Sequence, residues 1–369
     1  MTSRERLIKA MSGEKTDRTP FSPFLAYWWD AQEDTLTDRG ELEFLESIGT
    51  DPLFRGHYPV YGKKEEGIWL FKRTIEDCEI FTKINGNKKI MTYHTSKGDL
   101  NLGYQYVEEG NTWFLVDHPL KKEKDFLLLK YIMDSTRVEP NYEKFDREVE
   151  KLGDRGLLLP LICPEEKTAF QSLLERWAGT ENIVYSLMDF PEIVEETLES
   201  MYRVSRESAQ IAADSNSPFF LSWEDTSTTN ISPQYYRDYI LPEINMWCDI
   251  LHKRAKRYVQ HACGQLKALL PDIAESKIDV LESIAPSPTG NIDLKEVNEI
   301  FPSRISIVGG IEPVQLLNLS KDEIVRKAGE VINIMEKRGY VLANSDSCPP
   351  GVDIEKFAAL AQLVKSEKN

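Results

Sequence analysis

The chain has 369 residues, 41% of them hydrophobic and 10% aromatic, which is enough apolar material for one large α/β domain or two smaller ones. Its formal net charge of -16 argues against a nucleic-acid partner, because phosphate backbones are bound by clustered positive charge. No run of about 18 apolar residues occurs, so we expect no membrane association. The charged N-terminus has no apolar core of a signal peptide, and we expect a cytoplasmic protein.

Five cysteines, at positions 78, 163, 248, 263 and 348, are scattered along the chain. An odd and scattered set is not a disulfide framework and fits a reducing compartment. The thiols are therefore free to act as ligands. We expect Cys78, Cys163 and Cys248 to be packing residues.

The first segments predict an amphipathic helix from Ser3 to Met11 and a short buried strand from Phe21 to Ala26. Three aromatic residues follow the strand directly: Tyr27, Trp28 and Trp29. At the carboxyl end of a barrel strand they would form aromatic walls for a flat apolar ligand; alternatively they cover the core. His57 follows the next predicted strand and is a minor candidate for a substrate contact.

Short alternating segments separated by glycine and asparagine turns follow, a pattern typical of β-hairpins. We interpret residues 62–120 as an antiparallel meander inserted into a single domain that spans 1–369. His94 and His118 lie in this region, and we expect both to be surface or hairpin residues.

From about residue 120, short apolar strands alternate with helices. The predicted strands are Leu157–Cys163, Phe219–Asp225, Arg257–Cys263, Ile278–Ser283, Ile305–Gly310 and Tyr340–Asn344. With Phe21–Ala26 and a strand near Asp51–Phe54 the count is eight, which predicts an α/β fold of the (β/α)8 TIM-barrel type. No glycine-rich phosphate loop follows the first strand, which disfavours a dinucleotide-binding fold.

In such barrels the active site forms where the strands end. The polar residues at the predicted ends are Glu224, Asp225, His261, Cys263, Glu282, Glu312, Asp346 and Cys348. His261 and Cys263 lie two apart in a strand and therefore share a face, and a barrel would bring Cys348 to them. One histidine, two thiolates and an open fourth position make a catalytic zinc site; the alternative is a buried cysteine beside a core histidine.

Four further motifs stand out: the opening Ser3–Gly13 segment, His261-Ala262-Cys263-Gly264, Val308–Ile311, and Cys348 followed by Pro349-Pro350-Gly351. Together they resemble those of the uroporphyrinogen decarboxylase superfamily, and more narrowly of its zinc-containing, cobalamin-dependent methyltransferase branch. The chain departs from true decarboxylases because no arginine-rich segment follows Thr19-Pro20. That departure disfavours decarboxylation.

The resemblance implies methyl transfer between a small methylated substrate and a corrinoid on a separate protein, with Zn²⁺ held by His261, Cys263 and Cys348. A corrinoid-binding motif is absent from this chain, so the cofactor would arrive on a partner. Glu224 is a candidate fourth ligand or proton donor; alternatively it is an N-cap or surface carboxylate.

The direction of transfer is a second expectation. Tyr27, Trp28, Trp29 and Trp223 would suit an aryl methyl ether, which favours transfer from the ether to Co(I), an O-demethylation. Transfer from a methylcorrinoid to a thiol is the first alternative. A zinc-holding barrel that acts only as a binding module is the second.

Overall fold

The computed structural model describes residues 1–56, 67–108 and 112–366. They form two compact units. Unit 1 comprises 1–70, 142–161 and 215–369, and unit 2 comprises 71–141 and 162–214, each without the undescribed residues. No helix in the described part of the chain is long and apolar enough to cross a membrane.

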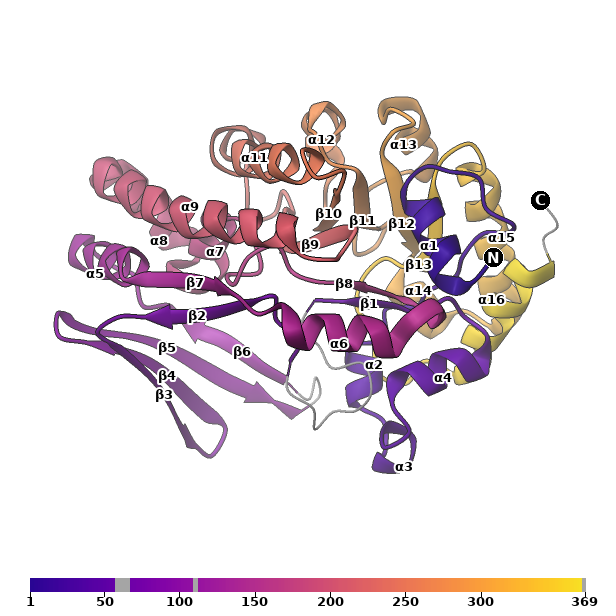
Figure 1. The fold of residues 1–369 in the computed structure, drawn as a ribbon, viewed down its shortest axis with the longest axis horizontal. Coiled ribbons are helices and arrows are strands. Elements are labelled where there is room, and N and C mark those ends of the chain that lie inside the picture. Colours follow the sequence, from indigo (N-terminus) through magenta and orange to yellow (C-terminus); the bar gives the residue numbers. More distant parts are fainter. Residues whose placement is uncertain (57–66, 109–111, 367–369) are drawn as a thin grey trace. The chain divides into compact units, whose positions relative to one another are not determined.

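Unit 1 is built on parallel strands (Figure 1). They are β1 (Leu53–Arg55), β8 (Leu157–Leu159), β9 (Phe219–Glu224), β10 (Arg257–Ala262), β11 (Val280–Ile284), β12 (Ser306–Ile311) and β13 (Tyr340–Asn344). Five strands form one sheet in the order β13-β12-β11-β10-β9, and β1 pairs with β8. Isolated parallel bridges, Phe21 to Leu342 and Leu161 to Leu221, extend from these ladders.

This pattern is an α/β fold consistent with a TIM barrel, although the ladders do not form one continuous eight-stranded sheet. The predicted strand Phe21–Ala26 is present only as the single bridge at Phe21. Pro23 explains the difference, because a proline has no N–H with which to continue a ladder. Residues 27–30 then form a helix instead of an extended strand end.

Helices connect and cover these strands. They are α1 (Ser3–Met11), α2 (Tyr27–Asp30), α3 (Asp34–Thr37), α4 (Glu41–Ile48), α6 (Tyr142–Leu152), η2 (Gly153–Arg155), α10 (Pro233–Tyr235), η4 (Tyr236–Ile240), α11 (Leu241–His252), η5 (Lys267–Leu269), α12 (Leu270–Glu275), α13 (Leu294–Ile300), α14 (Pro313–Asn318), α15 (Lys321–Met335) and α16 (Ile354–Ser366). α11 packs on β10, and α15 packs on β12 and β13 (Figure 1). The prediction of helix Ser3–Met11 is confirmed, and a capping box of Thr2 and Glu5 explains where it begins.

Alternate residues of the parallel strands form the core of unit 1. Its members are Leu7, Ala10 and Met11 of α1 together with Leu53, Leu157, Leu159, Phe219, Leu221, Val259, Val280, Val308, Val341 and Ala343. Side chains two apart in a strand share a face. The next layer towards the carboxyl ends is therefore Arg55, Trp223, His261 and Glu282.

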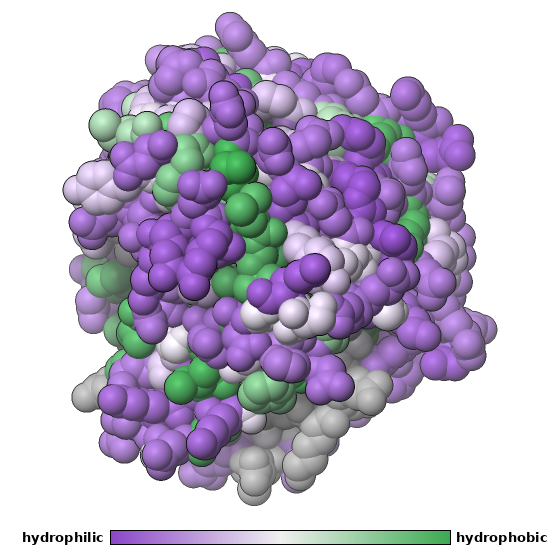
Figure 2. Space-filling view, turned by 90° about the vertical axis from the view of Figure 1, so that its left-hand side faces the viewer, coloured by the Kyte–Doolittle hydropathy of each residue, from purple (hydrophilic) through white to green (hydrophobic). Residues whose placement is uncertain are grey.

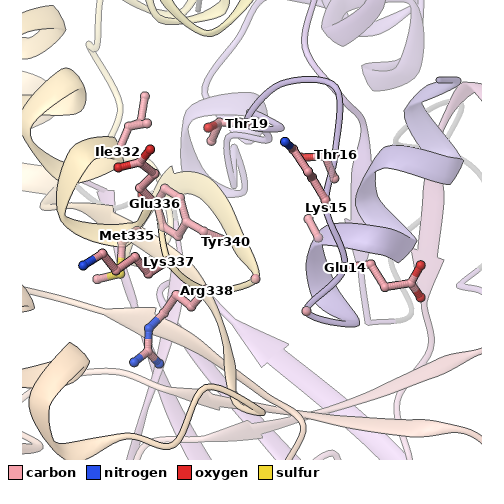
Figure 3. A pocket seen from close by; sticks show the side chains of 13 residues that line it. Glu14, Lys15, Thr16, Thr19, Ile332, Met335, Glu336, Lys337, Arg338 and Tyr340 are labelled. Carbon is pink, nitrogen blue, oxygen red and sulfur yellow. The ribbon is translucent and has the colours of Figure 1, made fainter. Parts of the chain in front are cut away.

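A cavity of about 410 Å³ lies between the segment after α1 and the segment that joins α15 to β13 (Figure 3). Gly13 and Gly339 are in its lining, and α1 approaches Gly339 closely there. A Cβ atom at Gly339 would overlap the carbonyl oxygen of Ala10 and the hydroxyl of Ser306 and lie 2.8 Å from the Cα atom of Gly13. The close approach thus requires a residue without a side chain.

We expect Gly339→Ala to lower the free energy of unfolding by about 1–3 kcal/mol, because the added methyl group overlaps backbone that cannot move independently. Gly329→Ala is the matched control, since nothing lies within 4 Å of its Cβ position and it is in helix α15. That control should stabilise the chain slightly. Urea unfolding followed by circular dichroism measures both, and equal effects would contradict the packing explanation.

Unit 2 consists of antiparallel strands and helices. The strands are β2 (Phe71–Ile75), β7 (Thr136–Pro140) and the sheet of β3 (Cys78–Asn85), β4 (Lys88–Thr95), β5 (Gly98–Val107) and β6 (Thr112–Asp117); the helices are α5 (Glu123–Asp134), α7 (Ala169–Ser172), η3 (Leu173–Trp177), α8 (Gly179–Asp189) and α9 (Pro191–Asp214). β2 pairs with β7, and α5 packs on α9. The bounds 62 and 120 of an inserted meander stay a prediction.

The surface of unit 2 carries both histidine and apolar side chains. His94 is exposed and its ring contacts Asp99 at 2.6 Å, whereas the ring of partly buried His118 lies 3.1 Å from the carbonyl oxygen of Arg176. Among the exposed apolar side chains of the sheet are Phe81, Ile90 and Phe114. The face of the molecule in Figure 2 is mostly hydrophilic, with apolar side chains gathered in patches.

Candidate active site

An ion pair lies directly above the core of unit 1. Arg55 at the end of β1 donates from Nε to Oε1 of Glu282 in β11, and the two residues are only 5% and 3% exposed. Burial raises the pKa of Glu282, but the charges of Arg55 and His261 outweigh it and bring that pKa to about 2. The guanidinium also lies 5.1 Å from the centre of the Phe24 ring. The floor of the site is therefore an ion pair without net charge, and it lies beside an aromatic ring.

His261 is fixed beside this pair. Its Nδ1 atom lies 3.0 Å from the hydroxyl of Ser283 and 3.6 Å from Oε2 of Glu282. The ring of Trp223 meets the imidazole edge-on at 4.9 Å. Since Nδ1 faces these groups, Nε2 is the nitrogen that can serve a ligand.

A β-bulge in β11 brings Glu282 and Ser283 to the same histidine. Consecutive strand residues normally point to opposite faces. Here the pairing of β11 with β12 shifts register between Glu282 and Ile284, and Ser283 has a left-handed φ of 73°. A bulge of this kind redirects a side chain, and such strain is typical of functional sites.

Stacked aromatic rings form a wall of the site. Phe24 and Trp223 lie 5.6 Å apart with an angle of 12° between their planes, and the Phe24 ring also meets His261 at 6.3 Å. Trp223 was predicted as a substrate contact, whereas Phe24 was not. Its place within the expected strand Phe21–Ala26 gave no signal that its ring would turn towards His261.

Cys263 follows His261 at the end of β10, and its sulfur lies 3.6 Å from Oδ1 of Asp225. Tyr27 belongs to the same neighbourhood: burial raises its pKa, and the charges of Asp346, Asp30 and Cys263 add to that effect. Tyr27 is 48% exposed. The structure thus brings a thiol and a phenol from the predicted set into one neighbourhood.

Cys348 does not share a metal-binding arrangement with His261 and Cys263. Its backbone N–H donates to the carbonyl oxygen of Phe24, and its own carbonyl oxygen accepts from Trp28. The thiol is buried 3.7 Å from the Pro349 carbonyl oxygen; burial raises its pKa, and the charge nearby is that of Lys356. Within residues 1–56, 67–108 and 112–366, no three His, Cys, Asp or Glu side chains are grouped so that they could hold a metal ion.

Glu224 lies on the opposite face of the sheet from His261. It pairs in register with Ala262, while its neighbour Trp223 pairs with His261. Oε1 of Glu224 accepts a hydrogen bond of 2.9 Å from Ser222, whose hydroxyl lies 2.5 Å from that of Tyr258. Glu282 is the carboxylate beside His261, a residue that the sequence identified only as one of several at strand ends.

Trp28 and Trp29 are core residues of α2 and its surroundings. Nε1 of Trp28 donates to the carbonyl oxygen of Val352, and its ring packs against Phe44 and Phe357. Trp29 also packs on Phe44. Both are buried, which matches the alternative that these rings cover the core. His57 lies outside the described residues.

Glu41, the first residue of α4, has a pKa raised to about 7, because burial and the charge of Asp30 outweigh the attraction of Arg55. The native state therefore binds this proton more tightly than the unfolded chain does. The free energy of unfolding should fall as the pH rises from about 4.5 to about 7.

We expect Glu41→Gln to remove this fall in the free energy of unfolding with rising pH. At pH 8 the variant should be more stable than the wild type by about 1–3 kcal/mol, and at pH 4 the two should be alike. Unfolding in urea at the two pH values measures the difference. An effect that is independent of pH would show that Glu41 is ionised in the native state throughout.

A family model described as uroporphyrinogen decarboxylase (URO-D) matches residues 115–367. The chain belongs to the URO-D family. No curated protein sequence matches it.

Two solved structures share the fold of this URO-D protein. A methyltransferase from Methanosarcina mazei has a TM-score of 0.61 and 14% identity, over 99% of this chain and 98% of its own. A B12-independent methionine synthase from Shewanella sp. W3-18-1, in complex with selenomethionine, has a TM-score of 0.50 and 9% identity, over 94% of this chain and 96% of its own. At these identities the likeness concerns the fold alone.

Proposed function

We propose that the chain is a methyltransferase that moves a methyl group from a small methylated donor, an aryl methyl ether, to the Co(I) of a corrinoid carried by a separate protein. The observation that carries this proposal is the setting of His261: its Nδ1 atom faces Ser283 and Glu282, its ring meets those of Phe24 and Trp223 edge-on, and Cys263 follows two residues later. The methyltransferase folds that the chain resembles support its methyl-transfer part. The new cobalt–carbon bond would use two electrons of Co(I), and the electron pair of the broken C–O bond would leave with the phenolate.

Zinc is part of the proposal, with His261, Cys263 and Cys348 as ligands. A histidine whose other nitrogen faces a carboxylate and a hydroxyl suits a metal ligand, and a thiol nearby suits zinc. The third donor fits less well, because Cys348 joins the set only if its thiol leaves the position beside Pro349. Bound zinc would supply Lewis-acid activation of the ether oxygen.

The other residues of the site would bind and orient the donor. The parallel rings of Phe24 and Trp223 can pack against a flat aromatic donor. Ser283 and Glu282 hold the imidazole in one orientation, so that Nε2 is directed away from them.

Free cob(I)alamin and a panel of methyl donors test the proposal, with the cobalt absorption change as the signal. The panel contains aryl ethers, methylamines, methanol and methyl thioethers. We expect transfer from aryl ethers. Transfer only from methylcobalamin to thiols would indicate the reverse reaction, and no transfer in either direction would leave a binding module.

Metal content tests the ligand set separately. We expect wild-type protein to retain one zinc per chain and Cys348→Ala to lose it. Stoichiometric zinc in Cys348→Ala would remove Cys348 from the set. Cys78→Ala is the control, because Cys78 lies in β3 of unit 2.

A further inference from the structure

The ion pair at the base of the site is incompletely bonded. Arg55 donates from Nε to Oε1 of Glu282 and from Nη1 to the carbonyl oxygen of Leu53 at 2.9 Å. Its Nη2 atom and Oε2 of Glu282 are both buried and have no hydrogen-bond partner within the described part of the chain. One donor and one acceptor of the same pair are therefore unsatisfied.

This deficit is unusual. Nε and Nη2 share one edge of the guanidinium, and a carboxylate that meets this edge squarely takes one hydrogen on each oxygen. Glu282 uses only Oε1 there, while Oε2 lies 3.6 Å from Nδ1 of His261, which is too long for a hydrogen bond. A buried charged group left without a partner is costly, so a polar ligand atom that bonded to the open arm of such a pair would be bound favourably.

The chemistry of the open arm favours groups that both accept and donate a hydrogen bond. Nη2 requires an acceptor and Oε2 requires a donor, and a hydroxyl is both. A carboxylate or phenolate could only accept and would meet the charge of Glu282, and a second ether oxygen could not donate. Because the rings of Phe24 and Trp223 stack next to Arg55, the hydroxyl should be carried by a flat ring.

We propose that Nη2 of Arg55 and Oε2 of Glu282 form a subsite for a neutral phenolic hydroxyl, so that the donor is a methoxyphenol. This inference rests on the proposed function, which it narrows from aryl methyl ethers to those with a free hydroxyl. It assigns Arg55 and Glu282 to substrate binding, in addition to the contact of Glu282 with His261.

Equilibrium binding tests the subsite without any methyl transfer. The probes are 2-methoxyphenol, 1,2-dimethoxybenzene, methoxybenzene and 2-methoxybenzoate, measured by isothermal titration calorimetry on the full chain. We expect wild-type protein to bind 2-methoxyphenol roughly 10- to 100-fold more tightly than the other three, the range of a hydrogen bond to a charged group. Similar affinity for 2-methoxyphenol and methoxybenzene, or no binding of any probe, would overturn the inference.

A double variant tests whether Arg55 and Glu282 cause the preference for the hydroxyl. Arg55→Met with Glu282→Met removes both charges together, which buried pairs tolerate better than the loss of one partner. We expect it to bind all four probes within about 2-fold of methoxybenzene. Trp223→Leu is the control and should weaken 2-methoxyphenol and methoxybenzene alike.

A preference for the hydroxyl that persists in the double variant would overturn the assignment to Arg55 and Glu282. The two proposals fail separately. Selective binding without transfer to cob(I)alamin would refute only the methyltransferase function. Transfer without a hydroxyl preference would refute only the subsite.

Discussion

Replacing His261 with alanine is expected to lower the rate of methyl transfer by about 10³-fold or more, because a metal that activates the leaving oxygen contributes several kcal/mol to catalysis. The imidazole is the donor whose orientation is fixed by two neighbours, Ser283 and Glu282. Bound zinc should be lost in parallel. The cobalt absorption assay and metal analysis of the purified variant measure the two effects.

His94→Ala is the control for this prediction, since His94 is exposed in the sheet of unit 2 and contacts Asp99. It should keep both zinc and activity. Full activity in His261→Ala would contradict the proposed site. Lost activity with zinc retained would show that His261 acts on the donor and is not a ligand.

The second large effect concerns stability. Replacing Asp51 with alanine is expected to lower the free energy of unfolding by about 3–5 kcal/mol, because it removes the buried carboxylate that Arg6 and Arg18 share and leaves Arg18 without an acidic partner. Asp51 is fully buried and accepts from Arg6 at 2.5 Å and from Arg18 at 2.7 Å. It also accepts from the backbone N–H of Phe21, so it ties α1 to the start of the first predicted strand. Urea unfolding followed by circular dichroism measures the loss.

Asp17 offers the matched control. It pairs with the same Arg6, but its side chain is 40% exposed. Asp17→Ala should cost less than about 1 kcal/mol, as surface ion pairs do. If the two variants were equally destabilised, burial of Asp51 would not be the cause of its effect.

Short sequence patterns determined much of the secondary structure of this protein. Helix Ser3–Met11 follows from its periodicity and cap, and the alternation of strands with helices after residue 120 follows from apolar runs and turns. These features depend on a few adjacent residues, which is why the sequence suffices.

Contacts between distant segments decided the rest. Phe219, Phe220 and Leu221 are all apolar and buried, so the sequence of β9 does not reveal which face is inward, and Glu224 proved to lie on the outer one. Proline ended the first strand early and left Trp28 in a helix that packs on the core.

Only the tertiary structure placed Glu282 and Ser283 together at His261, because their convergence requires a register shift between β11 and β12. Only the tertiary structure, likewise, showed that Arg55 pairs with Glu282, a residue 227 positions away in the sequence. Residue identity and spacing thus supplied the candidate residues. Which carboxylate and which thiol take part depends on side-chain directions that are fixed by bulges, helix starts and packing far along the chain.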